Sequence, residues 1–168
     1  MGVTGLAKPN YAAVKRAVRR LHDEFDITAP PVNPVEIARN LGVDVMFAKF
    51  GGDFQNISGF YDCEDNAIYV NRDEFPLRQT FTVAHELGHQ ILHSEWAKSE
   101  DYKMLMRDGD YSGNEPHEKE ANAFAAHLLV PRFMLDQYWK GSTVESLSKL
   151  FAVSVPMIKN RLAYEYGV

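Results

Sequence analysis

The feature that most constrains this chain is the segment FTVAHELGHQILH, residues 81–93, which contains an HExxH motif. A helix turns about 100° per residue, so His85 and His89 lie one turn apart on the same face and can reach one ion. Glu86 projects beside them, where it can take a proton from a water at the metal without being a ligand itself. The motif therefore predicts half of a zinc site on a helix, with Glu86 as the general base.

The residues around the motif favour a zinc site over a helix that carries two histidines by chance. Both histidines flank an apolar stripe at helical spacing, which partly buries them, and buried polar groups need a partner. The stripe consists of Leu77, Phe81, Ala84, Gly88, Ile91 and Leu92. Gly88 costs about 1 kcal/mol of helix stability relative to alanine, so we expect another backbone to approach closely at this position.

A tetrahedral catalytic zinc ion takes three protein ligands and one water, so a third ligand must come from elsewhere in the chain. His93 lies about 12 Å along the helix axis from His85, which is too far for His85, His89 and His93 to meet one ion. The spacing also differs from that of the metzincins, in which a third histidine follows the motif after a glycine. We therefore expect His93 to lie in the wall of a cleft or at the edge of the core.

The segment PHEKEANAFAAHLLVP, residues 116–131, is a second predicted helix, with prolines in its first turn and at its end. Helical projection places Glu118 on the apolar face of this helix, whereas Glu120 points to nearly the opposite side. A buried carboxylate is costly unless it is paired or binds a metal, so we predict that Glu118 is the third ligand. Glu120 remains an alternative ligand, because the phase near a helix end varies by a residue or two, and His117 is a weaker one.

Together the two segments resemble the ImmA/IrrE family of metallopeptidases, which are gluzincin-like HExxH zinc enzymes. A third segment, ISGFYDCEDNAIYVNRD, is similar to the family's strand pair before the active-site helix, and the resemblance covers residues 34–166. Transferred residue by residue, it implies that His85, His89 and Glu118 bind Zn²⁺. It also implies that Glu86 is the catalytic carboxylate.

The resemblance implies a function as well. The better-understood family members relieve repression by cleaving, or causing the cleavage of, a helix-turn-helix repressor of a mobile element or stress regulon. Many of them carry an N-terminal DNA-binding domain, but residues 1–33 are too few for one, so we expect an XRE-type repressor supplied in trans. The resemblance thus implies a zinc endopeptidase that hydrolyses a peptide bond in a regulatory protein.

The alternative is a non-proteolytic regulator or toxin–antitoxin partner that holds zinc for structure and binds a transcription factor or DNA. A structural zinc site is usually closed by four protein ligands, often cysteines, and has no need of a carboxylate beside its water. The chain shows no obvious fourth ligand, and Glu86 is intact. These features favour the enzyme.

Length and composition agree with a small enzyme. The chain has 168 residues, enough for one domain to bury a core without disulfides or structural staples. Its single cysteine, Cys63, excludes an intramolecular disulfide framework. No apolar run approaches the roughly 18 residues of a membrane span, and the N-terminal residues lack the apolar core of a signal peptide. We therefore expect a cytoplasmic protein with no membrane partner.

The hydrophobic pattern predicts an α+β fold in which helices pack on one side of a small twisted sheet, with a zincin-like core. The elements expected before the HExxH helix are helices at residues 10–25 and 34–41, a strand at 43–50, and a hairpin of 57–61 and 67–70. We expect one metallopeptidase domain over residues 1–168. Its parts are an N-terminal helix and linker (1–33), a zincin-like core (34–132) and a C-terminal helical region (133–168).

The C-terminal region resembles a helix-turn-helix, because its last residues predict two helices joined by a turn at residues 152–154. Its basic side chains are largely balanced by acidic ones, and the whole chain has a formal net charge of −5. Non-specific DNA affinity comes mainly from neutralised phosphates, so this balance argues against direct DNA binding. We expect the pair to pack against the catalytic core instead.

Residues 94–117, between the two predicted ligand-bearing helices, are rich in acidic residues and glycine. This segment is either a solvated surface loop or a mobile rim of the cleft, and its apolar island at residues 104–106 either docks on the core or offers a contact. The sequence does not identify which residue stabilises the oxyanion. The possible donors are His93, His127, Tyr102 and Tyr111.

Overall fold

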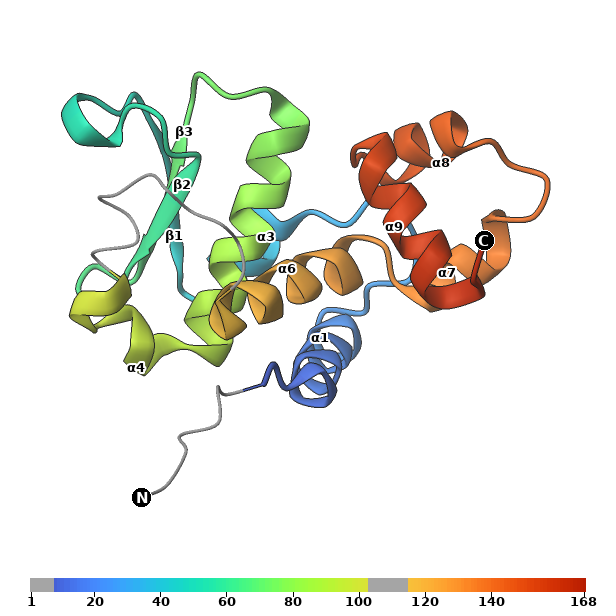
Figure 1. Cartoon of the computed structure of the whole chain (residues 1–168), viewed down its shortest axis with the longest axis horizontal. Coiled ribbons are helices and arrows are strands. Elements are labelled where there is room, and N and C mark those ends of the chain that lie inside the picture. Colours follow the sequence, from blue (N-terminus) through green and yellow to red (C-terminus); the bar gives the residue numbers. More distant parts are fainter. Residues whose placement is uncertain (1–7, 103–114) are drawn as a thin grey trace.

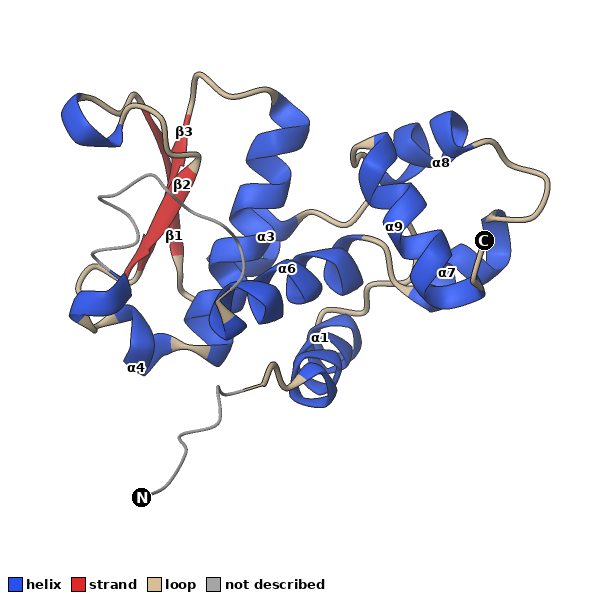
Figure 2. Cartoon of the chain, in the orientation of Figure 1, coloured by secondary structure: helices blue, strands red, loops and turns tan. Residues whose placement is uncertain are grey.

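The computed structural model describes residues 8–102 and 115–168, and it has the predicted α+β architecture (Figures 1 and 2). The expectations for the island at 104–106 and for Tyr111 lie outside the described residues. Among the described residues, no helix combines the length and apolar character needed to cross a membrane. The elements in chain order are α1 (Tyr11–Glu24), α2 (Pro34–Asn40), β1 (Asp44–Ala48), η1 (Gly52–Phe54), β2 (Gly59–Asp62), β3 (Ala67–Asn71), α3 (Pro76–Leu92), α4 (Ser94–Ala97), α6 (Pro116–Leu129), α7 (Arg132–Tyr138), α8 (Val144–Phe151) and α9 (Val155–Tyr166).

The sheet has the order β1-β3-β2, with β3 in the middle. β3 runs parallel to β1 and antiparallel to β2, so the predicted hairpin is present. Ile68 and Val70 of β3 are fully buried, as expected for a central strand covered by neighbours. Asn66 adopts a left-handed conformation in the hairpin turn, with φ of 48°, and its side chain accepts a hydrogen bond of 2.7 Å from the Tyr61 hydroxyl. The strand β1 is shorter than expected, because its pairing with β3 ends at Ala48, opposite the last β3 residue, Asn71.

Helix α3 packs beside the sheet, and α6 lies between α3 and α1 (Figure 1). The predicted apolar face of α6 is buried, including Phe124 and Leu128, which are fully inaccessible. Val14 and Val18 of α1 are buried in the same core. This core therefore holds α3 and α6, the two helices on which the sequence placed the candidate ligands.

Two expectations for α3 were wrong in detail. Leu77 is 44% exposed and does not join the core stripe, because it lies on the wall of a cleft. A close neighbour does face Gly88, but it is not a backbone. A Cβ atom at Gly88 would lie 3.0 Å from Cδ1 and Cγ of the Phe124 ring on α6. The glycine lets a bulky aromatic side chain sit against the helix.

The C-terminal helical pair, α8 and α9, packs on the rest of the chain as predicted. Arg161 of α9 is buried, and its Nε donates a hydrogen bond of 2.9 Å to the carbonyl oxygen of Val130 after α6. The rings of Trp139 and Tyr166 stack with centroids 4.3 Å apart. The hydrophobic pattern did not predict α7 as a separate helix, because α7 has only 7 residues and no side-chain cap.

Candidate metal centre

Two helices supply the candidate ligands. α3 carries His85 and His89 one turn apart, and both side chains face α6. Glu118 lies in the first turn of α6 and is buried, with only 3% of its surface exposed. The contact between Gly88 and the Phe124 ring lies where the two helices meet, so it sets how closely they approach.

The structure brings the three predicted ligand residues together. Nε2 of His85 lies 2.8 Å from Oε2 of Glu118, and Nε2 of His89 lies 2.8 Å from Oε1 of the same carboxylate. One ligand atom from each residue lies within 4.8 Å of the others, and all three residues are buried. The three residues meet although they are far apart in the sequence, because the phase of each helix turns its ligand side chains toward the core.

The atoms in this group fit a metal ion better than a closed network of hydrogen bonds. Among the described residues, Nε2 of His89 and Oε2 of Glu118 are buried, and their 2.8 Å contacts within the group lack the geometry of regular hydrogen bonds. Buried polar atoms without regular hydrogen bonds are rare in folded proteins and call for an ion or another bound group. Two imidazoles and one carboxylate form a typical ligand set for a catalytic metal with an open position.

The pKa values of two of these groups match the protonation states that a metal needs. Burial favours a higher pKa for Glu118, but its contacts with His85 and His89 lower that pKa to about 2. Burial lowers the pKa of His89 to about 4. At neutral pH Glu118 is therefore charged and His89 is neutral, which are the forms that bind metals.

The pKa of His85 shifts in the opposite direction from that of His89. Burial lowers its pKa, but Glu118 and Glu86 together raise the pKa above its ordinary value. Two carboxylates in a buried site thus favour a positive charge at this position. A divalent cation between these side chains would satisfy the same electrostatic demand.

Glu86 lies next to the metal-binding group and is buried. Burial raises the pKa of its carboxyl group to about 7. The Tyr102 hydroxyl donates a hydrogen bond of 3.3 Å to Oε2 of Glu86 and accepts one of 2.8 Å from the backbone N–H of Tyr61. Burial, followed by the charge of Glu86, raises the pKa of Tyr102 well above its usual value, so the hydroxyl keeps its proton. A carboxyl group that titrates near neutrality suits a general base.

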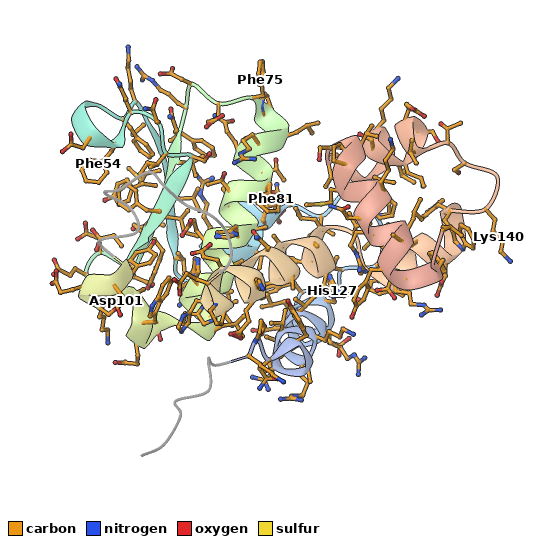
Figure 3. The ribbon with its side chains drawn as sticks, in the orientation of Figure 1. Phe54, Phe75, Phe81, Asp101, His127 and Lys140 are labelled. Atoms are coloured by element: carbon orange, nitrogen blue, oxygen red, sulfur yellow. The ribbon has the colours of Figure 1, made fainter. Side chains whose placement is uncertain are left out.

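A cleft of about 1340 Å³ opens over this group and extends between α3, α6 and the C-terminal pair. Its lining includes His85, Glu86 and Glu118. Figure 3 shows Phe75 at the outer end of α3, with Phe81 further along the same helix; both line the cleft. The volume exceeds the roughly 300–1,000 Å³ of ordinary small-molecule pockets, so a segment of polypeptide would fit.

Two of the residues that the sequence offered as possible oxyanion donors, Tyr102 and His127, line different parts of the cleft. Tyr102 lines it and contacts Glu86. His127 also lines it but lies at the far end of α6 (Figure 3), nine residues beyond Glu118 and about 13 Å along the helix axis. Nothing in the sequence singles out Tyr102, because its approach to Glu86 depends on the path of the chain after α4.

His93 and Glu120 lie away from the cleft. His93 is 7% exposed and sits at the edge of the core, the second of its two expected places. Its Nδ1 lies 2.9 Å from Nδ1 of His89, and its Nε2 lies 3.5 Å from Oε1 of Glu120. Glu120, the alternative ligand, therefore faces His93, whereas Glu118 faces both motif histidines.

Known proteins show which family this arrangement belongs to. The chain is 34% identical to the radiation response metalloprotease IrrE of Deinococcus radiodurans over 147 residues, which are 83% of this chain and 42% of that protein. It is 31% identical over 130 residues to the uncharacterized immunity region protein 2 of Bacillus phage phi105, covering 76% of this chain and 75% of that one. This chain therefore spans less than half of the Deinococcus relative.

A solved structure supports the fold. A Mycobacterium tuberculosis transcriptional regulator superposes with a TM-score of 0.63 at 18% identity, over 90% of this chain and 46% of that one. The family described as IrrE N-terminal-like domain, peptidase family M78, matches residues 38–163. This match includes the HExxH helix and the helix that carries Glu118, and together with the named relatives it supports a metallopeptidase. The chain belongs to the IrrE N-terminal-like family of peptidases.

Proposed function

We propose that this chain is a zinc endopeptidase in which His85, His89 and Glu118 hold the metal and Glu86 is the general base. The observation that carries the proposal is the buried group of two histidines and one carboxylate, whose ligand atoms lie within 4.8 Å of one another beside a cleft large enough for a segment of polypeptide. Zinc is the metal that this ligand set and an open fourth position fit best. We also propose that residues 1–168 act as one domain, because the family match continues into the C-terminal pair.

Each residue of the site has a defined task in peptide hydrolysis. Zinc, when bound, polarises the substrate carbonyl and makes a water more acidic. Glu86 accepts a proton from the attacking water as the new carbon–oxygen bond forms. When the carbon–nitrogen bond breaks, Glu86 returns this proton to the leaving amine. Tyr102 donates its single hydroxyl proton to the carboxylate of Glu86, so it orients the base and has no second proton for an oxyanion.

We propose that the substrate is a regulatory protein, a helix-turn-helix repressor of the XRE type supplied in trans. The phage relative is named an immunity region protein, and the Deinococcus relative is named for a radiation response. Both names connect relatives of this chain with regulated states of the cell or prophage. An extended segment of the repressor would occupy the cleft between α3 and α9, with its scissile bond over the metal-binding group.

The decisive experiment replaces Glu86 by glutamine. Glu86→Gln keeps the size of the side chain and its contact with Tyr102 but removes the proton acceptor. We expect zinc content to remain while cleavage falls by about 100-fold or more, the typical contribution of a general base. The readouts are elemental analysis, cleavage of any helix-turn-helix repressor found to be encoded beside this gene, and relief of its repression in cells.

Glu36→Gln is the matched control, because Glu36 is an exposed carboxylate on α2 and does not line the cleft. This variant should match the wild type in all three readouts. If Glu86→Gln still relieves repression as well as the wild type, proteolysis is not the mechanism. The non-proteolytic regulator that binds a transcription factor would then explain the data.

A further inference from the structure

His93 and Glu120 take no part in the proposed chemistry, yet they lie directly behind it. His93 Nδ1 is 2.9 Å from His89 Nδ1, and His93 Nε2 is 3.5 Å from Oε1 of Glu120. Their side chains are only 6% and 15% exposed. A line of contacts therefore runs from Glu118 through His89 and His93 to Glu120, beginning and ending on α6.

The contact between the two imidazoles determines where their protons lie. A hydrogen bond between two ring nitrogens needs one donor and one acceptor, so only one of the two Nδ1 atoms carries a proton. A metal at Nε2 of His89 uses the lone pair of that atom, and the neutral ring then has its proton on Nδ1. His89 is therefore the donor in this state, and His93 accepts at Nδ1.

The same reasoning fixes the tautomer of His93. Because its Nδ1 has no proton, the neutral ring carries a proton on Nε2, the atom that faces Glu120. Within the described part of the chain Nε2 of His93 is buried and forms no closer hydrogen bond. At 3.5 Å the Glu120 carboxylate attracts this N–H mainly through its charge.

Aromatic packing holds the two rings in this arrangement. The Trp96 ring lies against His89 and His93, with centroids 5.2 Å and 6.0 Å away. The His117 ring stacks on Trp96, with centroids 4.3 Å apart and an interplanar angle of 6°, and its centroid lies 4.8 Å from that of the His93 ring. Rotation of either imidazole would break these contacts together with the hydrogen bond.

We propose that His93 is the positioning residue of the metal ligand His89, accepting its Nδ1–H bond, and that Glu120 anchors His93 from α6. This inference rests on the proposed metal site. It assigns the last histidine of HELGHQILH to orientation of a ligand, and it gives Glu120 a role distinct from that of Glu118. A partner of this kind fixes the ring so that Nε2 points at the metal, and its loss typically weakens metal binding by about 10- to 100-fold.

The test compares His93→Asn with His93→Leu, two side chains of similar size and shape. The amide oxygen of asparagine occupies the place of Nδ1 and can still accept from His89, whereas leucine cannot accept a hydrogen bond. Zinc affinity, measured by competition with a chromogenic chelator, should fall about 10- to 100-fold in the leucine variant. The asparagine variant should stay within about threefold of the wild type, because its acceptor is retained. Circular dichroism of both zinc-free variants checks that they fold.

A second measurement uses the wild type and does not depend on how the variants fold. In the zinc-loaded protein with ¹⁵N-labelled histidine, NMR should show protons on Nδ1 of His89 and on Nε2 of His93. A proton on Nδ1 of His93, or equal zinc affinity in the leucine variant and the wild type, overturns the positioning role while the metal site stands. Failure of the wild type to bind zinc at all overturns the proposed metal site instead.

Discussion

At the scale of single residues, two glycines decide how closely other groups approach α3. A Cβ atom on Gly59, at the start of β2, would lie 2.5 Å from the carbonyl oxygen of Tyr69 and 2.6 Å from Cγ2 of Thr82 on α3. At Gly88 the nearest atoms belong to the Phe124 ring and lie 3.0 Å away. The first contact involves a backbone oxygen held in the sheet, so it has less room to relax. The edge of the sheet beside the cleft therefore depends on Gly59.

We expect Gly59→Ala to destabilise the protein more than any conservative change at the surface. The added methyl group must displace either β3 or α3, and such overpacking costs about 1–3 kcal/mol or more of unfolding free energy. Denaturant unfolding measures the effect. Gly51→Ala is the control, because a Cβ atom at Gly51 would meet nothing within 4 Å and its φ is −130°. Equal stability of the two variants would show that β2 can shift freely.

At the scale of elements, the contact between α6 and α9 forms the far wall of the cleft. Arg161 is 3% exposed, and its Nη2 donates a hydrogen bond of 2.8 Å to Oε1 of Glu165 one turn further on. Its Nε satisfies the Val130 carbonyl, which follows the last turn of α6. His127 of α6 points toward the same cluster, with Nδ1 4.0 Å from Glu165. One buried guanidinium thus joins the C-terminal pair to a ligand-bearing helix.

This cluster predicts a loss of stability in acid. Burial, and then the charge of Arg161, lowers the pKa of His127 to about 4, from 6.5 in a free side chain. Between these two values the unfolded chain binds more protons than the folded one, so stability falls as the pH drops from 6.5 toward 4. The contribution of His127 is fully present above that window. It amounts to roughly 1 kcal/mol per pH unit within it.

His127→Gln should remove this part of the pH dependence, because glutamine does not titrate. Urea unfolding of the wild type and the variant at several pH values across the window measures the difference. A chelator in every sample removes bound metal, so that release of metal at low pH does not add to the measured difference in stability. Parallel stability curves for the two proteins would mean that His127 titrates normally in the folded state.

At the scale of the whole molecule, the metal-binding group connects segments that are far apart in the chain. His85 and His89 lie on α3, whereas Glu118 lies on α6. α6 also packs against α1, near the N-terminus of the chain (Figure 1). An ion bound by α3 and α6 would therefore stabilise the folded protein as a unit, because the unfolded chain has no preformed site.

Zinc should consequently raise the melting temperature of the metal-free protein. Binding at a free concentration of 100 times the dissociation constant adds about 2.7 kcal/mol to the unfolding free energy. Glu118→Ala should abolish this shift, whereas Glu120→Ala should at most reduce it and still bind about one zinc per chain at saturation, since all three ligands remain. Magnesium is the control metal, because it prefers oxygen ligands in octahedral geometry. A shift that depends on Glu120 and not on Glu118 would exchange their roles.

Much of the candidate site was predictable because it depends on local geometry. The period of an α-helix alone places His85 and His89 on one face and Glu86 beside them. The same period placed Glu118 on the buried face of its helix, and the structure confirms that burial. The hairpin and the packing of the C-terminal helices were also predictable, since apolar alternation and apolar faces are properties of short segments.

Only the tertiary structure decided which residues from distant segments meet. It placed Tyr102 against Glu86, paired His93 with Glu120, set the Phe124 ring against Gly88, and left Leu77 exposed at the cleft. Each of these contacts depends on the angle and separation at which helices and loops pack. Periodicity within a segment shows which face turns inward, but it carries no information about what that face will meet. The sequence therefore determined the residues available for the chemistry, and the packing of α3, α6 and the chain after α4 determined their neighbours.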